Sequence, residues 1–152
     1  MGVMATPQIH PTAAIADAAS LGADVIIGPY AVVEAGVRLG AGVQLGPHAV
    51  LRAGTEVGDK ASIDAHAVIG GLPQDLGFDP SVASGVRIGA GAVVREHVTV
   101  NRSTREGGLT EVGAQAYLMA ACHVPHDALI GARTIIANGV LSMISDNVFV
   151  AT

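Results

Sequence analysis

The side chains best suited to chemistry lie together in one short segment. His123, His126 and Asp127 form the pattern H-x-x-H-D. Histidine is the most common general base, because its imidazole titrates near neutral pH. A catalytic zinc ion would need three convergent histidines, and two histidines three residues apart do not supply them. The segment therefore favours proton transfer over metal chemistry, with a solvated surface histidine as the simpler alternative.

A six-residue repeat sets the frame that must position these side chains. Aliphatic residues recur at every sixth position from Ile9 to Ile69, and the period resumes at Val82 and again at Val112, ending at Ile136. Neither the 3.6-residue period of an α-helix nor the two-residue period of a strand continues in this way. We expect each hexad to form a short strand and a turn, and three hexads to close a triangular coil of about 18 residues. This predicts an all-β chain, a parallel β-helix of about seven coils.

A second column, of small or β-branched residues, separates the inside of the coil from the outside. These residues lie four positions after the aliphatic ones, as at Thr104 and Cys122. Both columns should point inward, because side chains alternate between faces along a strand. The phase then buries Cys122 as a filler of the core and leaves His123, His126 and Asp127 outside it.

The remaining histidines and the frequent glycines are expected to have no role in the chemistry of the site. A glycine often follows the aliphatic residue, as at Gly89, where it is expected to ease the corner of the coil. The other histidines form no cluster in the sequence and are expected on the surface; they are His10, His48, His66 and His97.

Two breaks in the period mark loops, because a solenoid ejects insertions and keeps its stacking. They fall near 71–81, which contains two prolines and two glycines, and near 105–111. After Ile136 the phase slips by two residues, so 141–152 is expected to form an irregular last coil. Residues 1–152 are thus predicted to form one domain whose loops project from one corner, where loops on a rigid scaffold commonly bind ligands.

Composition narrows the function classes further. The net charge is −5 and charged residues make up only 14% of the chain, so the clustered Lys and Arg that nucleic-acid binding needs are missing. No apolar run reaches the roughly 18 residues of a membrane span. A single Cys allows no internal disulfide, and the first residues lack the charged and apolar regions of a signal peptide. A cytoplasmic protein is therefore expected.

Several segments together resemble one enzyme family. They are PQDLGFDP, REHVTVNRSTREGGLTEVG, YLMAACHVPHDALIG and IIANGVL, and the similarity runs from about Ile9 to Leu141. On these motifs the chain is similar to the UDP-N-acetylglucosamine O-acyltransferases of lipid A biosynthesis. The resemblance implies a left-handed β-helix, against the usual right-handed crossover preference. It also implies a homotrimer with active sites in the clefts between subunits, and no metal or other cofactor.

The resemblance further implies a reaction and residue roles. Family members move a 3-hydroxyacyl group from acyl carrier protein to the 3-hydroxyl of UDP-N-acetylglucosamine. His126 matches the family's general base, which takes the proton of the sugar hydroxyl. Asp127 matches a residue that binds substrate or holds His126 in the useful tautomer. His123 matches a substrate-contacting histidine, and Gln74 and Asp75 match loop residues that contact the nucleotide sugar.

The sequence also departs from the family pattern. Gly77 replaces the usual Lys after Q-D-L, so a basic contact is lost. Asn101 stands where the family usually has His, and we include it among the predicted substrate-binding residues because its amide can donate and accept hydrogen bonds. Ser142 and Met143 fill the space of a unit whose glycine amide helps to polarise the thioester carbonyl. No C-terminal helical domain is expected.

These departures leave two other functions open. One is a weak or inactive trimeric β-helix scaffold that keeps the fold and a nucleotide-sugar site. The other is a zinc-dependent hexapeptide protein such as a γ-class carbonic anhydrase, which the spacing of the histidines disfavours.

Overall fold

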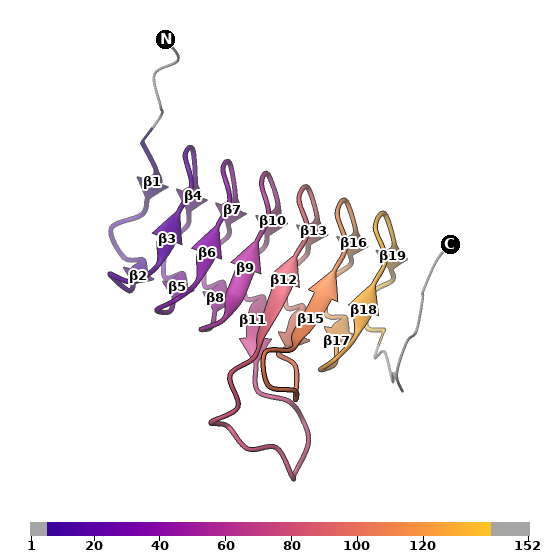
Figure 1. The fold of residues 1–152 in the computed structure, drawn as a ribbon. Helices are drawn as coiled ribbons and strands as arrows, with labels where there is room; N and C mark the ends of the chain where they lie inside the picture. The colour runs from indigo at the N-terminus through magenta and orange to yellow at the C-terminus, as the bar shows by residue number, and fades with distance from the viewer. Residues whose placement is uncertain (1–5, 141–152) are drawn as a thin grey trace.

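The chain folds into a three-sided, left-handed parallel β-helix, in which each coil lies on the one before it (Figure 1). This computed structural model describes residues 6–140, so the irregular last coil predicted at 141–152 lies outside the described residues. Within residues 6–140, nineteen strands make six three-sided coils and the first side of a seventh. The six-residue period therefore predicted the architecture correctly.

Every strand belongs to one of three parallel sheets, which are the three sides of the prism. Sheet A contains β1 (Gln8–Ile9), β4 (Ile26–Ile27), β7 (Gln44–Leu45), β10 (Ser62–Ile63), β13 (Val93–Val94), β16 (Tyr117–Leu118) and β19 (Ile135–Ile136). Sheet B contains β2 (Ala14–Ile15), β5 (Val32–Val33), β8 (Val50–Leu51), β11 (Val68–Gly71), β14 (Thr99–Asn101) and β17 (His123–Val124). Sheet C contains β3 (Ser20–Leu21), β6 (Arg38–Leu39), β9 (Thr55–Val57), β12 (Gly85–Ile88), β15 (Leu109–Val112) and β18 (Leu129–Ile130).

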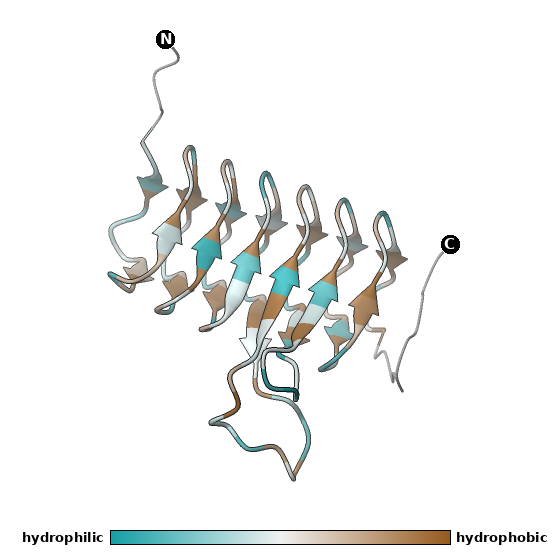
Figure 2. Cartoon of the chain, in the orientation of Figure 1, coloured by the Kyte–Doolittle hydropathy of each residue, from teal (hydrophilic) through white to brown (hydrophobic). Residues whose placement is uncertain are grey.

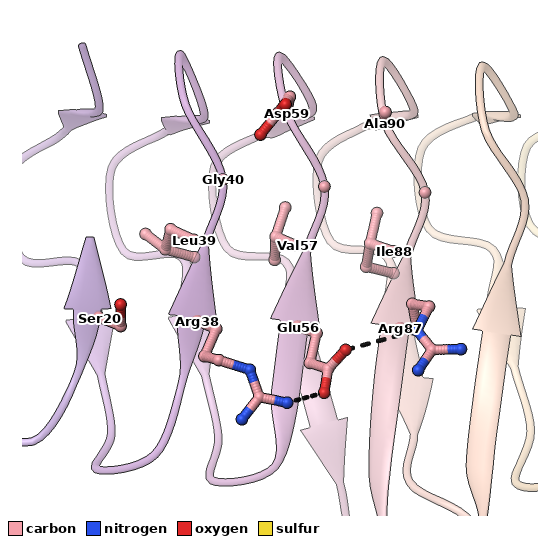
Figure 3. A pocket seen from close by; sticks show the side chains of 12 residues that line it. Ser20, Arg38, Leu39, Gly40, Glu56, Val57, Asp59, Arg87, Ile88 and Ala90 are labelled. Carbon is pink, nitrogen blue, oxygen red and sulfur yellow. Dashed lines mark hydrogen bonds and ion pairs between the residues drawn. The ribbon is translucent and has the colours of Figure 1, made fainter. Parts of the chain in front are cut away.

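The outer faces of the sheets differ in polarity (Figure 2). Sheet B presents the half-buried valines Val32, Val50 and Val68. Sheet C instead carries a row of alternating charges that crosses a shallow groove (Figure 3). In that row Arg87 lies 3.4 Å from both Glu56 and Glu111, and Glu56 also pairs with Arg38. The charges of the groove thus neutralise one another and leave no net charge to attract an ionic ligand.

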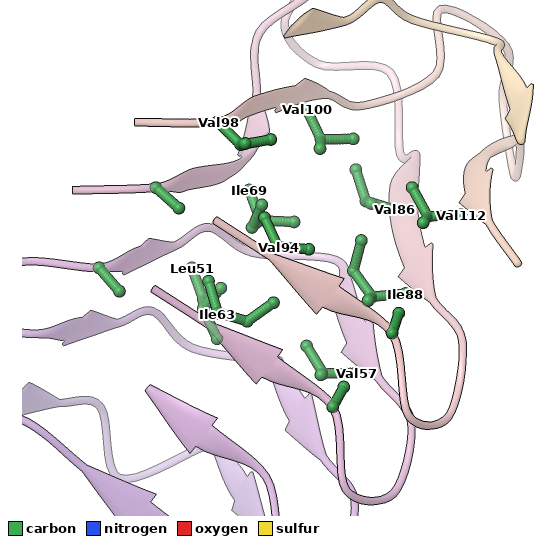
Figure 4. Packing of buried hydrophobic residues seen from close by; sticks show 14 of the residues in the cluster. Leu51, Val57, Ile63, Ile69, Val86, Ile88, Val94, Val98, Val100 and Val112 are labelled. Carbon is green, nitrogen blue, oxygen red and sulfur yellow. The ribbon is translucent and has the colours of Figure 1, made fainter. Parts of the chain in front are cut away.

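The core is a stack of aliphatic layers, one for each coil (Figure 4). The two inward columns predicted from the sequence supply nearly all of it. Cys122 is 1% exposed within this core, which confirms it as a filler, and burial raises the pKa of its thiol to about 11. A thiol in this environment is inert as a nucleophile.

The phase prediction was wrong at two positions, both beside loops. Val82 and Thr104 were placed in the inward columns, but each is half-buried in an irregular connection. Thr110, which is fully buried, takes the small-residue place predicted for Thr104. Ile69 and Val86 fill consecutive core places on either side of the first loop, opposite Leu51 and Thr55, and leave none for Val82. The period cannot locate the residue where an insertion ends, because an inserted segment has no reason to contain a multiple of six residues.

Two long connections leave the prism at the same corner, between sheets B and C (Figure 1). The first, 72–84, joins β11 to β12, and the second, 102–108, joins β14 to β15 in the next coil. Sequence reasoning expected them at 71–81 and 105–111.

Within the described part of the chain, the structure contains no helix with the length and apolar character of a membrane span.

Candidate functional site

His126 and Asp127 lie at the corner between sheets B and C, one coil beyond the second loop. They follow β17 and precede β18, so the corner is held on both sides by paired strands. Asp127 has φ of 60°, a left-handed conformation that Asp and Asn tolerate better than most residues. His126 Nδ1 lies 3.0 Å from Asp127 Oδ2.

The loop 102–108 surrounds the Asp127 carboxylate with hydroxyl donors. Ser103 donates to Oδ1, and Thr104 donates to Oδ2 through its hydroxyl at 2.5 Å and through its backbone N–H at 3.3 Å. The backbone N–H of Asp127 donates to the Thr110 hydroxyl at 2.9 Å. The Arg105 guanidinium lies 3.9 Å from Oδ1. With its side chain only 15% exposed, Asp127 has most of its hydrogen-bonding capacity satisfied by the protein.

These donors determine the charge of Asp127. Burial alone would raise its pKa, but the hydrogen bonds from Ser103, Thr104 and His126 outweigh burial and lower the pKa to about 2. The carboxylate is therefore ionised at neutral pH and can only accept hydrogen bonds. Its contact with His126 requires a proton on Nδ1. In neutral His126 the lone pair is then on Nε2, and the side chain is 34% exposed and accessible.

His123 lies on the outer face of sheet B, beside this pair. Its Nδ1 lies 2.7 Å from the hydroxyl of Thr99, its pairing partner in the coil before. Burial lowers the pKa of His123, and the nearby His126 lowers it further. His123 is therefore neutral at pH 7 and can offer Nε2 to a ligand. The structure thus brings together His123, His126 and Asp127.

The other predicted site residues belong to the first loop and its base. Asn101 is 5% exposed, and its side-chain amide donates to the Leu72 carbonyl at 2.7 Å. It therefore anchors the start of the loop. Gln74 and Asp75 are exposed further along it, and Asp75 accepts a hydrogen bond from the Gly77 backbone N–H at 2.8 Å. They lie on the loop that leaves the same corner as His126, and their role as ligands remains a prediction.

Arg102 makes contacts with the first loop that the sequence did not predict. Its guanidinium donates to the Val82 carbonyl at 2.8 Å and to the Pro80 carbonyl at 2.7 Å, and it lies 5.1 Å from the centre of the Phe78 ring. Ser103, Thr104 and Thr110 were also missed as partners of Asp127. The sequence shows Arg102, Ser103 and Thr104 side by side, but their contacts could not be read from spacing.

The exposed histidines also lie closer together than the sequence suggested. At the corner between sheets A and B, the rings of Tyr30, His48, His66 and His97 stack face to face, with centroids 4.8 to 5.0 Å apart. They are on the surface as predicted, but they form one row instead of isolated positions. Residues 6–140 contain no group of three or more His, Cys, Asp or Glu side chains arranged to hold a metal ion.

Comparison with known proteins finds relatives of the chain in one group of transferases. Residues 36–71 match the family described as bacterial transferase hexapeptide (six repeats). The acyl-[acyl-carrier-protein]–UDP-N-acetylglucosamine O-acyltransferase of Leptothrix cholodnii is 44% identical over 131 residues, and that of Cupriavidus pinatubonensis is 50% identical over 131 residues. The alignments cover 86% of this chain and 50% and 49% of those proteins. The chain therefore spans about half the length of the curated relatives it matches.

Solved structures give the same result. LpxA from Acinetobacter baumannii matches with a TM-score of 0.82 at 34% identity, over 86% of this chain and 51% of that one. LpxA from Bacteroides fragilis, a UDP-N-acetylglucosamine acyltransferase, matches with a TM-score of 0.83 at 38% identity, over 87% of this chain and 51% of that one. In sequence and in coil architecture, the chain is thus similar to UDP-N-acetylglucosamine O-acyltransferases over 86% of its own length and about half of theirs.

Proposed function

We propose that the protein transfers a 3-hydroxyacyl group from acyl carrier protein to the 3-hydroxyl of UDP-N-acetylglucosamine, with His126 as general base. The observation that carries this proposal is the contact between His126 Nδ1 and the ionised Asp127. A fixed proton on Nδ1 leaves Nε2 as the proton acceptor, which a sugar hydroxyl requires before it can attack. The names of the relatives supply the substrates.

In the proposed reaction one imidazole, that of His126, both accepts and returns the proton. Nε2 of His126 takes the proton of the sugar hydroxyl, and the oxygen attacks the thioester carbonyl of the acyl carrier. The C–S bond then breaks, the new C–O ester bond remains, and His126 returns the proton to the departing thiolate. Asp127 stabilises the imidazolium that exists between these two proton transfers.

The nucleotide sugar is proposed to lie between the first loop and the corner. Gln74 and Asp75 would contact it from the exposed loop, and neutral His123 would donate from sheet B. Asn101 would act by holding Leu72, because so little of its side chain is accessible.

A homotrimer is part of the proposal, because family members share their sites between subunits. The outer face of sheet B supports it, since Val32, Val50 and Val68 form an apolar strip beside the site. The charged row on sheet C makes that side the poorer interface. Light scattering of the full chain should give three times the monomer mass, and a monomer would exclude a shared cleft.

The second candidate is a scaffold that binds a nucleotide sugar without turning it over. The observation that favours it is Gly77, which stands where the family usually has a basic side chain. Without that side chain the loop offers less charge to a diphosphate.

One experiment separates the two candidates. Acyl transfer to UDP-N-acetylglucosamine is measured for the wild type and for His126→Asn, and nucleotide-sugar binding is measured by calorimetry. Loss of a general base should lower kcat about 10²- to 10⁴-fold with binding retained. The control is His10→Asn, an exposed imidazole whose contact is with Thr12, and it should keep full activity. Binding without turnover in the wild type would favour the scaffold.

A further inference from the structure

We propose that the tripeptide Arg102-Ser103-Thr104 is a positioning element that holds the two halves of the site in register. One half is the loop 72–84, which carries Gln74 and Asp75, and the other half is the His126–Asp127 pair. The inference rests on the proposed function for the identity of the substrate, but its contacts stand on the structure alone.

Arg102 fixes the first half. Its two terminal nitrogens donate to the carbonyls of Pro80 and Val82, and its plane lies over Phe78. Its backbone N–H also donates to the Gly71 carbonyl at 2.8 Å. One residue therefore holds the base of the loop and its returning limb. A planar guanidinium can make this pair of hydrogen bonds in one geometry, which an ammonium group cannot reproduce.

Ser103 and Thr104 fix the second half. Both hydroxyls donate to the Asp127 carboxylate, one to each oxygen. An accepting carboxylate held on both oxygens cannot rotate away from His126, so the imidazole keeps its Nδ1 proton and its orientation. Ser103 and Thr104 touch no reacting atom in the proposed reaction, so they act through Asp127.

The two halves are also joined directly through Ser103. Its carbonyl accepts a hydrogen bond from the Ser84 hydroxyl at 2.5 Å, and its backbone N–H donates to the Gly85 carbonyl at 3.3 Å. Ser84 and Gly85 are the end of the first loop and the start of β12. A displacement of the tripeptide would therefore move the loop and the Asp127 carboxylate together.

The test uses two variants, each of which removes the contacts between the tripeptide and one half of the site. Thr104→Val removes the hydroxyl but keeps the shape, and kcat should fall about tenfold with KM for the nucleotide sugar changed less than about twofold. NMR of the His126 ring should show a smaller fraction of the Nδ1–H tautomer. Thr104→Ser keeps a hydroxyl at this position, so its kcat and its fraction of the Nδ1–H tautomer should stay close to those of the wild type.

Arg102→Lys should have the opposite effect on the two kinetic constants, changing KM and not kcat. KM for the nucleotide sugar should rise about tenfold with kcat changed less than about twofold. Amide exchange should accelerate across 72–84, and the His126 tautomer should stay as in the wild type.

The readouts separate this inference from the proposed function. An unchanged His126 tautomer in Thr104→Val, or unchanged exchange of the loop in Arg102→Lys, would overturn the positioning role whether or not the wild type turns over. If both variants show their effects on tautomer and amide exchange but the wild type shows no acyl transfer, the tripeptide is supported as a positioning element and the enzyme is rejected.

Discussion

At the scale of single residues, the site depends on keeping one carboxylate ionised. Asp127 is mostly buried, which alone would favour its neutral form, yet three side chains donate to it and hold its pKa at about 2. The unfolded chain has an Asp pKa near 3.8. A carboxyl group whose pKa is lower in the folded state stabilises the fold above the unfolded pKa, and this contribution is lost as the pH falls through the folded pKa.

Asp127→Asn should therefore destabilise the protein in a pH-dependent way. Asn tolerates the left-handed backbone at this corner, so the change removes mainly the charge. The free energy of unfolding should fall by about 1–2 kcal/mol at pH 7 after allowance for solvent screening. The difference should shrink below about pH 4 and vanish only below about pH 2, as measured by urea unfolding across that range.

A matched control lies at another corner. Asp24 is an exposed aspartate with φ of 57°, and Asp24→Asn should change the stability by less than about 0.5 kcal/mol. Equal stability of Asp127→Asn and the wild type at pH 7 would contradict the account of the carboxylate.

At the scale of elements, the corners of the coil show why ring side chains collect in a row. The same corner position recurs in each coil, and there Tyr30, His48, His66 and His97 all have φ between 57° and 61°. Identical backbone geometry in successive coils directs the side chains the same way. Coils one strand spacing apart then bring the rings to 4.8–5.0 Å, within the range of offset stacking.

His66→Asn should remove two of the three ring contacts in this row, those with His48 and His97. Asn is compatible with φ of 61°, so the expected loss of about 0.5–1 kcal/mol of unfolding free energy reflects the stacking itself. Thermal unfolding of His66→Asn beside His10→Asn, which lies outside the row, would measure it. A loss of the same size in both variants would mean that the stack contributes nothing.

At the scale of the whole molecule, stability depends on how closely the coils approach. Gly89 was expected to ease a corner, but its φ lies outside the left-handed region. A Cβ at Gly89 would instead lie 2.4 Å from the Ala114 nitrogen in the next coil. Glycine is needed there because a side chain would force the backbones of two coils apart.

Gly89→Ala should consequently lower the free energy of unfolding by about 1–3 kcal/mol, the usual cost of overpacking. Gly77→Ala is the control, since the nearest atom to its added Cβ is Asp75 Oδ1 at 3.5 Å. Chemical denaturation of both variants would compare them. If Gly89→Ala had the same free energy of unfolding as the wild type, the coils could move apart without loss of stability.

The amino-acid sequence is sufficient to predict the repeating part of this protein. A six-residue period fixes the three sides, the inward columns and the outward placement of His123, His126 and Asp127, because each hexad repeats the same local geometry. It also fixes Cys122 as a core residue. These features follow from positions along the chain, which a sequence contains in full.

The surroundings of those residues depend on the tertiary fold and could not be predicted from the repeat. The donors to Asp127 come from a loop about 23 residues earlier in the chain, and Arg102 reaches carbonyls about 20 residues before it. Neither loop follows the period, so their backbone angles, and hence their contacts, cannot be read from spacing. The misplacement of Val82 and Thr104 has the same origin: the repeat predicts a residue's environment only where neighbouring coils impose it.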